Sequence, residues 1–184
     1  MLPRFVVITG LPGSGKTTLA GQLARALDLP VFDKDTILEH LFDTRGTGDS
    51  AHRRALSRES DTLFQAQASA SPGAVLVSFW RQPGMASDSG TPTAWISELP
   101  APVVNVHCVC PPEVAAERFA CRTRHAGHLD SQRPFEVLLA SLRQLAALPP
   151  LALGPRIDVD TTQPIDLEAI LRQIGASGNS SDAR

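Results

Sequence analysis

The sequence has 184 residues, of which 42% are hydrophobic and 20% are charged, and its formal net charge at pH 7 is −2. A chain of this length and composition is expected to fold as one globular domain that needs neither a disulfide nor a structural metal for stability. The small negative net charge excludes a global basic surface of the kind that gathers nucleic acid, although it leaves a local basic patch open.

Short apolar runs and longer helical patterns alternate from the N-terminus onward. Residues 5–8 are apolar and mostly β-branched, and they predict a first strand that ends at Thr9 and Gly10. Leucines then recur every four residues up to residue 27 and predict a first helix. Residues 29–32 predict a second strand, which closes on Asp33 and is followed by a helical pattern and a loop at residues 44–50.

The same alternation continues to the C-terminus. The remaining strands are expected at residues 74–79, 103–109 and 157–159. The remaining helices are expected at residues 51–70, 111–122, 134–148 and 165–174. A loop is expected at residues 81–93, and the polar, Gly-containing segment at residues 123–133 is typical of a mobile lid.

This order of elements predicts the fold class. Strands and helices that alternate about five times form a doubly wound α/β sheet, with parallel strands and helices on both faces. No repeat or linker divides the chain, so residues 1–174 are expected to form one domain. The remaining residues, 175–184, are rich in Gly, Ser and Asn and are expected to be a disordered tail.

Residues 10–17 match the phosphate-loop pattern G-x-x-x-x-G-K-[ST] at every fixed position, between a predicted strand and a predicted helix. Glycines turn the backbone tightly and expose N–H groups to phosphate oxygens, and the helix N-terminus adds partial positive charge. Lys16 is expected to reach the β- and γ-phosphates, and the Thr17 hydroxyl is expected to ligate Mg²⁺. A purely structural Gly-rich turn is disfavoured, because both the pattern and its context match. The residues predicted to bind the nucleotide are Gly10, Leu11, Pro12, Gly13, Ser14, Gly15, Lys16, Thr17 and Thr18.

Two aspartates, Asp33 and Asp35, follow the predicted second strand. The carboxyl ends of parallel strands face the ligand crevice, so we expect these carboxylates near the phosphate loop. One can hold Mg²⁺, directly or through water, while the other accepts a proton from an attacking hydroxyl. The alternative is that Asp35 is the N-cap of the helix that begins at Thr36. Both roles can also be filled, one by each aspartate.

With these two motifs, the sequence resembles the P-loop small-molecule kinases, which include shikimate kinase, gluconate kinase, chloramphenicol phosphotransferase and AAA-type predicted kinases. The resemblance covers residues 5–174 and is specific at the phosphate loop and at the D-x-D. It implies a P-loop NTPase fold with strand order 2-3-1-4-5, a small lid at about residues 118–134, and ATP and Mg²⁺ as cofactors. It also implies that Asp33 serves the metal and that Asp35 serves the acceptor hydroxyl as its base.

The lid of this family carries arginines that close on the phosphates, so the candidates here are Arg118, Arg122 and Arg124. Arg122 and Arg124 lie next to the Gly-His segment and are preferred as catalytic residues, together with Lys16 and Asp35. The alternative is that these arginines are solvated charges at the C-terminal end of a helix, where positive charge is favourable. The lid histidines are interpreted as exposed side chains that can also contact substrate or phosphate.

Two departures from the family pattern bear on the substrate and the metal. Shikimate kinases carry three glycines after strand three, whereas this chain has Ser-Phe-Trp-Arg at residues 78–81. Shikimate is therefore disfavoured as the acceptor. No acidic residue occurs at 75–80 to serve as a Walker B aspartate. Magnesium would then be held by Thr17, Asp33, water and phosphate oxygens.

The acceptor side is predicted from basic and aromatic residues near the same edge of the sheet. An aromatic residue beside an arginine can form the floor and the anion clamp of a pocket, and family resemblance adds an arginine from the helix at residues 51–70. The alternatives are a core position for Phe79 and a solvated charged face for that helix. The residues predicted to contact the acceptor are Asp35, Arg54, Arg58, Trp80 and Arg81.

Together these features predict an ATP- and Mg²⁺-dependent kinase that phosphorylates a hydroxyl group of a small molecule. Two alternatives stay open, namely a polynucleotide or nucleoside 5'-hydroxyl kinase and a regulatory ATPase or nucleotide switch. The three cysteines have neither a disulfide-framework nor a zinc-site spacing, and no stretch reaches the roughly 20 apolar residues that span a bilayer. We therefore expect a cytoplasmic protein with reduced thiols and with neither a membrane nor a nucleic acid as its partner.

Overall fold

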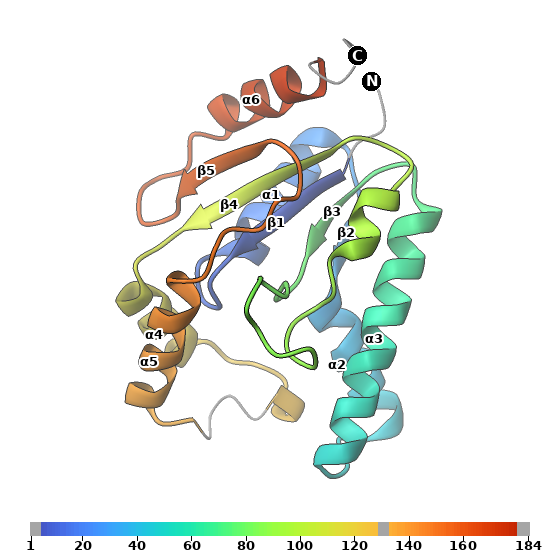
Figure 1. Cartoon of the computed structure of the whole chain (residues 1–184), viewed down its shortest axis with the longest axis vertical. Helices are drawn as coiled ribbons and strands as arrows, with labels where there is room; N and C mark the ends of the chain where they lie inside the picture. Colours follow the sequence, from blue (N-terminus) through green and yellow to red (C-terminus); the bar gives the residue numbers. More distant parts are fainter. Residues whose placement is uncertain (1–4, 129–132, 180–184) are drawn as a thin grey trace.

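The computed structural model describes residues 5–128 and 133–179. Its centre is a parallel sheet of five strands in the order β2-β3-β1-β4-β5 (Figure 1). The strands are β1 (Phe5–Gly10), β2 (Val31–Asp33), β3 (Ala74–Val77), β4 (Val103–Val109) and β5 (Arg156–Asp160). This order confirms the predicted P-loop NTPase fold.

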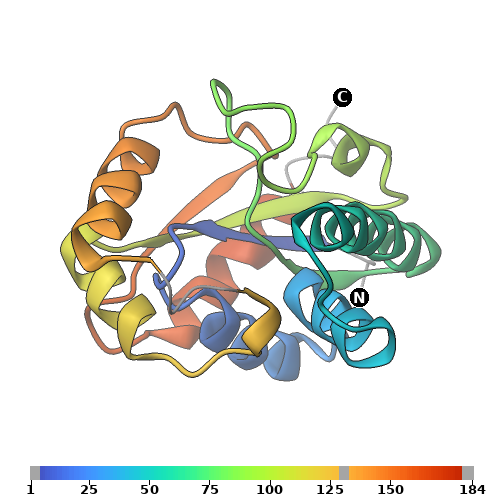
Figure 2. The ribbon, with the colours of Figure 1, turned by 90° about the horizontal axis from the view of Figure 1, so that it is seen from below.

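Helices cover both faces of the sheet. The α-helices are α1 (Lys16–Leu27), α2 (Lys34–Arg45), α3 (Ser50–Ala70), α4 (Pro112–Cys121), α5 (Phe135–Ala146) and α6 (Leu167–Asn179). Two 3₁₀ turns, η1 (Ala94–Glu98) and η2 (Ala126–His128), lie in the connections. Figure 2 shows α1 and α6 on one side of the sheet and α3 with η1 on the other. None of the helices in the described part of the chain is long and apolar enough to cross a membrane.

The core follows from the alternation of side chains along β1. Val6 and Ile8 point to the face covered by α1 and α6, whereas Phe5 and Val7 point to the opposite face. The first face is closed by Leu19, Leu23, Ile170 and Ile174, and the second by Phe64, Ala68, Trp95 and Ile96. Because β1 is buried on both faces, its C-terminal end and the loop that follows are held firmly.

The strand register brings the motif residues to one edge of the sheet. Val77, the last residue of β3, pairs with Asp33 of β2 on one side and with Ile8 of β1 on the other. Asp33 therefore lies level with the end of β1, where the phosphate loop begins. Helices α4 and α5 pack against each other near this edge, and residues 122–128 run from α4 across to α2 (Figures 1 and 2).

Among the boundaries that differ from the sequence prediction are those of the C-terminal tail, of β3 and of α2. The expected disordered tail is wrong as far as Asn179, because α6 continues to that residue from its buried anchor at Ile174; residues 180–184 lie outside the described residues. Strand β3 ends at Val77 rather than at residue 79. Helix α2 extends into the expected loop and ends at Arg45. The expected lid lies partly outside the described residues, at 129–132.

Candidate active site

The loop between β1 and α1 has the backbone of an anion cradle. Gly13 and Gly15 have φ of 82° and 87°, in the left-handed region that favours glycine. A Cβ on Gly13 would lie 2.1 Å from the carbonyl oxygen of Ala115 in α4, so a side chain cannot be placed there. Gly15 caps α1 without any side-chain acceptor, which leaves the first N–H groups of this helix to an anion.

Lys16 is folded back over the same loop. Its ammonium group donates to the carbonyl oxygens of Gly10 at 3.0 Å and Leu11 at 2.8 Å. Burial lowers the pKa of Lys16 to about 8, because the charged form loses hydration that these contacts only partly replace. A bound polyphosphate would restore that lost stabilisation.

The nine residues predicted to bind nucleotide separate into two groups. The residues that line the main cavity are Pro12, Gly13, Gly15, Lys16, Thr17 and Thr18. The other three are placed differently. Leu11 packs against α4 and α5, Ser14 is fully buried, and Gly10 lines a separate cavity of about 310 Å³ beside β4.

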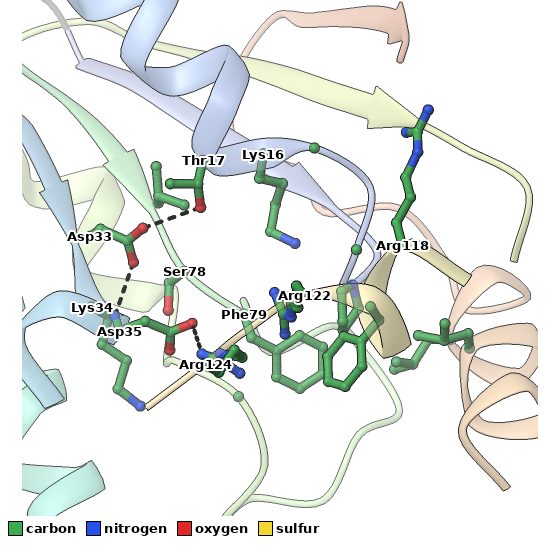
Figure 3. A pocket seen from close by; sticks show the side chains of 18 of the residues that line it. Lys16, Thr17, Asp33, Lys34, Asp35, Ser78, Phe79, Arg118, Arg122 and Arg124 are labelled. Carbon is green, nitrogen blue, oxygen red and sulfur yellow. Dashed lines mark hydrogen bonds and ion pairs between the residues drawn. The ribbon is translucent and has the colours of Figure 1, made fainter. Parts of the chain in front are cut away.

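Asp33 connects α1 to α2 through two hydrogen bonds. Its Oδ2 accepts from Thr17 Oγ1 at 3.3 Å, and its Oδ1 accepts from the backbone N–H of Asp35 at 2.9 Å (Figure 3). Asp33 is therefore the N-cap of α2, and the alternative of Asp35 as the cap is wrong, because the helix begins earlier than expected, at Lys34. Burial, and then the neighbouring Asp35, raise the pKa of Asp33 to about 6.

The pair Thr17 and Asp33 fits a magnesium ion that is shared with a nucleotide. Mg²⁺ prefers oxygen ligands, keeps several waters and is usually bound through one or two carboxylates together with phosphate oxygens. The hydroxyl and the carboxylate here are adjacent and stand beside the phosphate loop. Within residues 5–128 and 133–179, no group of three or more His, Cys, Asp or Glu side chains forms a metal site made by protein alone.

Asp35 lies in the first turn of α2 and points into the cavity. Its Oδ2 forms an ion pair with Arg124 Nη2, from the segment that follows α4 (Figure 3). Arg122 lines the same cavity, with its guanidinium 4.0 Å from the centre of the Phe119 ring. Arg118 donates to the carbonyl oxygen of Thr161 at 3.1 Å and points away from Asp35. The preferred pair of lid arginines and the two aspartates are thus brought together.

These groups surround one cavity of about 610 Å³. Its basic side chains are Lys16, Lys34, Arg118, Arg122, Arg124 and Arg133, and its carboxylates are Asp33 and Asp35. Six positive groups against two negative ones make this cavity basic, although the whole chain carries a formal net charge of −2. A field of that sign attracts polyphosphate anions.

A second cavity, of about 370 Å³, lies next to the first and contains three of the predicted acceptor residues, Arg54, Arg58 and Arg81. Lys34 and Ser57 line both cavities, which are therefore neighbours. The guanidinium of Arg81 is held by the carbonyl oxygens of Ser89 at 2.9 Å and Gly90 at 3.2 Å.

Lys34 is a site residue that the sequence reasoning missed. It lies between the two aspartates of the D-x-D, and its side chain is buried, with Nζ 3.2 Å from Asp61 Oδ1 and 3.0 Å from Ser57 Oγ. Asp61 also accepts from Thr91 Oγ1 at 2.8 Å, which ties α3 to the loop after β3. The only signal in the sequence is a lysine placed between the two aspartates of the D-x-D, and no periodicity reveals its partner.

The predicted places of Phe79 and Trp80 are exchanged. The sequence places Trp80 in the acceptor pocket, but this residue is 3% exposed, packs against Phe64 and Trp95, and donates from Nε1 to the Ile8 carbonyl oxygen at 2.8 Å. Phe79, interpreted as a core residue, lines the main cavity. Trp80 joins the same core cluster as Ala74 and Leu76, so the alternation of β3 is carried on to it beyond the end of the strand at Val77.

Comparisons with known proteins agree with this fold. Residues 5–148 match the AAA domain family AAA_33. A segment of 81 residues is 36% identical to the shikimate kinase of Corynebacterium glutamicum, covering 41% of this chain and 45% of that protein. The chain spans less than half the length of the curated relatives it matches, with 23% and 45% of the first two covered.

Solved structures resemble the chain over nearly its whole length. A candidate kinase from Chloroflexus aurantiacus J-10-fl is 28% identical, with a TM-score of 0.77 over 96% of this chain and 99% of that one. A gluconokinase from Sinorhizobium meliloti 1021, 23% identical with a TM-score of 0.56 over 97% of this chain and 93% of that one, shares the fold. The chain belongs to the AAA domain family AAA_33, and the predicted similarity to P-loop small-molecule kinases is confirmed.

Proposed function

We propose that this protein is a kinase that uses ATP and Mg²⁺ to phosphorylate a hydroxyl group of a small molecule. The observation that carries the proposal is the meeting of the phosphate loop, the Thr17–Asp33 pair and Asp35 in one basic cavity. A second carboxylate beside the proposed metal-binding one is suited to take the proton of an acceptor hydroxyl. A kinase that uses ATP would act in the cytoplasm.

The phosphate side of the reaction is assigned to the loop and to the N-terminus of α1. Their N–H groups would bind the phosphates, and Lys16 would leave the carbonyl oxygens of Gly10 and Leu11 to bind the β- and γ-phosphates. Thr17 and Asp33 would hold Mg²⁺, which supplies positive charge to the β- and γ-oxygens when it is bound. These groups stabilise the negative charge that the transferring phosphoryl group carries.

The acceptor side is assigned to Asp35. The hydroxyl oxygen of the acceptor forms the new bond to the γ-phosphorus, the bond from that phosphorus to the β,γ-bridging oxygen breaks, and ADP leaves. Asp35 takes the proton of the hydroxyl. Before transfer, Arg124 would leave Asp35 for the γ-phosphate, which both releases the base and neutralises the transferring group.

The second cavity suggests the class of acceptor. Lys34, Arg54, Arg58 and Arg81 line it, against the carboxylates of Asp61 and Asp88. Guanidinium groups are suited to carboxylates and phosphates. We therefore assign to this cavity an anionic group of the acceptor, whose hydroxyl would reach Asp35 in the adjoining cavity.

The experiment that tests the proposal is transfer from γ-labelled ATP by the purified chain. The acceptors are a panel of hydroxylated small molecules in anionic and neutral forms, and an oligonucleotide with a 5'-hydroxyl. Label is expected on an anionic small molecule and should be lost in Lys16→Ala, while Asp28→Asn, at the exposed C-cap of α1, serves as the control. Phosphate release that no acceptor changes would instead indicate a regulatory ATPase, and label on the oligonucleotide a polynucleotide kinase.

A further inference from the structure

The second cavity carries more positive charge than its own carboxylates balance. Its basic side chains are Lys34, Arg54, Arg58 and Arg81, and its carboxylates are Asp61 and Asp88. Lys34 and Asp61 already form an ion pair at 3.2 Å. The three guanidinium groups therefore share one exposed carboxylate, that of Asp88. An excess of two positive charges is left for a ligand to balance.

Arg54 and Arg58 carry most of this excess. They are four positions apart on α3, so their side chains leave the same face of the helix one turn apart. Among residues 5–128 and 133–179, neither guanidinium group forms an ion pair or a hydrogen bond. Two like charges at this spacing repel each other and weaken a helix. An anion bound between them would remove that repulsion.

Arg81 adds a third guanidinium group, from the loop that follows β3. Its Nε and Nη2 donate to the carbonyl oxygens of Ser89 and Gly90, and its backbone N–H donates to the Thr91 carbonyl oxygen at 2.9 Å. These bonds leave the N–H groups of Nη1 for a ligand. Because the side chain is half-buried and already held, a ligand that binds to it has little ordering cost to meet.

The number and the arrangement of these cations select the kind of anion. A carboxylate is planar, carries one negative charge and matches one guanidinium fork. A phosphate monoester carries a charge of about −1.5 to −2 at pH 7 and has three terminal oxygens around a tetrahedral phosphorus. It can accept from several forks that lie in different planes, and it balances both excess charges. The second cavity, of about 370 Å³, has room for this group and a small organic body.

We propose that the second cavity binds a phosphate monoester, and that the acceptor is therefore a small molecule that already carries one phosphate group and a free hydroxyl. The assignment of this group to the acceptor rests on the proposed function. In the reaction, the free hydroxyl oxygen bonds to the γ-phosphorus, the bond from that phosphorus to the β,γ-bridging oxygen breaks, and Asp35 takes the hydroxyl proton. The products are ADP and a bisphosphate.

Lys34 connects the phosphate monoester site to the proposed base. It lines both cavities, and it extends beside Asp35 from the first turn of α2 (Figure 3). Its ammonium group has three N–H donors, of which two face Asp61 and Ser57. Asp61 balances its charge, so the third donor is suited to a neutral oxygen of the acceptor rather than to the phosphate. A molecule bound in the second cavity would thereby be directed toward Asp35.

Calorimetric titration of the ligand-free full chain at pH 7.5 tests the site without any transfer reaction. The first probe is glycerol 3-phosphate, a phosphate monoester, and the second is its methyl diester, which carries a single negative charge. Glycerate supplies one carboxylate, and malate supplies two separate ones. Glycerol 3-phosphate is expected to bind about fivefold more tightly than each of the other three.

Variants locate the bound probe, because the phosphate loop also binds phosphate groups. Arg54→Gln and Arg58→Gln should each weaken glycerol 3-phosphate binding about three- to fivefold, and the double variant about tenfold or more. Lys16→Ala should keep the binding in the second cavity. Arg53→Gln is the matched control, because it removes the same charge from the neighbouring position, where Nη1 donates to the Gly48 carbonyl oxygen at 2.8 Å. It should bind the probe as the wild type does.

Three results would overturn the assignment. The first is that glycerol 3-phosphate does not bind. The second is that it binds no more tightly than the diester, glycerate or malate. The third is that its binding is lost in Lys16→Ala and kept in the double arginine variant, which would place it at the phosphate loop.

Label transfer from γ-labelled ATP to hydroxylated phosphate monoesters separates this inference from the proposed function. If glycerol 3-phosphate binds as expected and no acceptor receives label, the phosphate monoester site stands and the kinase proposal fails. If label appears on neutral or carboxylate acceptors with no preference for phosphate monoesters, the kinase proposal stands and the assignment of the second cavity fails.

Discussion

Asp33 holds the helix on which Asp35 lies, since Asp33 Oδ1 accepts the backbone N–H of Asp35 at 2.9 Å. The other oxygen of the same carboxylate accepts from Thr17 Oγ1 at 3.3 Å. The proposed metal ligand and the proposed base are therefore fixed relative to each other by a single N-cap. A substitution at Asp33 that removes the N-cap would displace both carboxylates. A substitution that keeps the N-cap would change the proposed metal ligand and leave Asp35 in place.

Asp33→Asn is expected to stabilise the ligand-free chain at pH 7.5. The folded chain raises the pKa of Asp33 from 3.8 to about 6, so its stabilising contribution is complete below pH 3.8 and is lost as the pH rises through about 6. Asparagine stays neutral and still caps the helix, so the expected gain at pH 7.5 is on the order of 1–3 kcal/mol. Urea unfolding at pH 7.5 and pH 4 measures it. A gain of equal size at both pH values would contradict the prediction.

The same variant should lose the response to magnesium. Wild-type chain with ATP is expected to gain stability when Mg²⁺ is added, because binding to the folded state alone stabilises it. Asp33→Asn should need a much higher Mg²⁺ concentration for the same rise in melting temperature. An unchanged magnesium dependence would remove Asp33 from the proposed metal site.

Asp35→Asn should separate transfer from nucleotide binding. General-base help is typically worth about 10²–10⁴-fold, so transfer to the acceptor should fall within that range while ATP affinity stays near the wild-type value. Rapid-quench measurement of label transfer, together with calorimetric titration of ATP, gives both quantities. Transfer at the wild-type rate would leave Asp35 as only the partner of Arg124.

ATP affinity should weaken as the pH rises above about 8. Burial lowers the pKa of Lys16 to about 8 in the ligand-free chain, so above that pH the amine must take up a proton before it can bind phosphate. The dissociation constant should rise by up to about tenfold per pH unit. Calorimetry in two buffers of different ionisation enthalpy should detect proton uptake at pH 9 and little at pH 7. Lys16→Arg, whose side chain stays charged, should bind with no such dependence, and a flat wild-type profile would argue against the assignment.

Substitutions of Trp80 and Arg58, two residues predicted to contact the acceptor, should have different effects on stability and on the KM for the acceptor. Trp80→Phe removes the buried hydrogen bond to the Ile8 carbonyl and should cost about 1–3 kcal/mol of stability without changing the KM for the acceptor. Arg58→Gln, at an exposed residue that lines the second cavity, should raise that KM at nearly unchanged stability. Denaturant unfolding and acceptor titration of both variants measure these effects. A raised KM in Trp80→Phe, or an unchanged KM in Arg58→Gln, would contradict the prediction.

Much of the fold and of the phosphate site could be predicted because their signals are local. The period of the apolar residues reports each strand and helix, and the crossover rule then restricts how parallel strands connect. The exact ends of the strands and helices leave a weaker signal, and small errors there had consequences. The earlier start of α2 moved the N-cap from Asp35 to Asp33, and β3 ended at Val77 rather than at residue 79.

The phosphate loop could be read from eight consecutive residues, because these contain the glycines, the lysine and the start of the following helix. The groups that face this loop depend instead on tertiary packing. Arg124 meets Asp35 across 89 positions of the chain, and Lys34 meets Asp61 across an interhelical contact. Such pairs depend on how α2, α3 and the segment after α4 pack around one sheet edge, and that packing leaves no periodic trace in the order of residues. The electrostatic potential in a cavity is the sum of contributions from the charges that lie near it in space. A net charge of −2 for the whole chain does not reveal that sum.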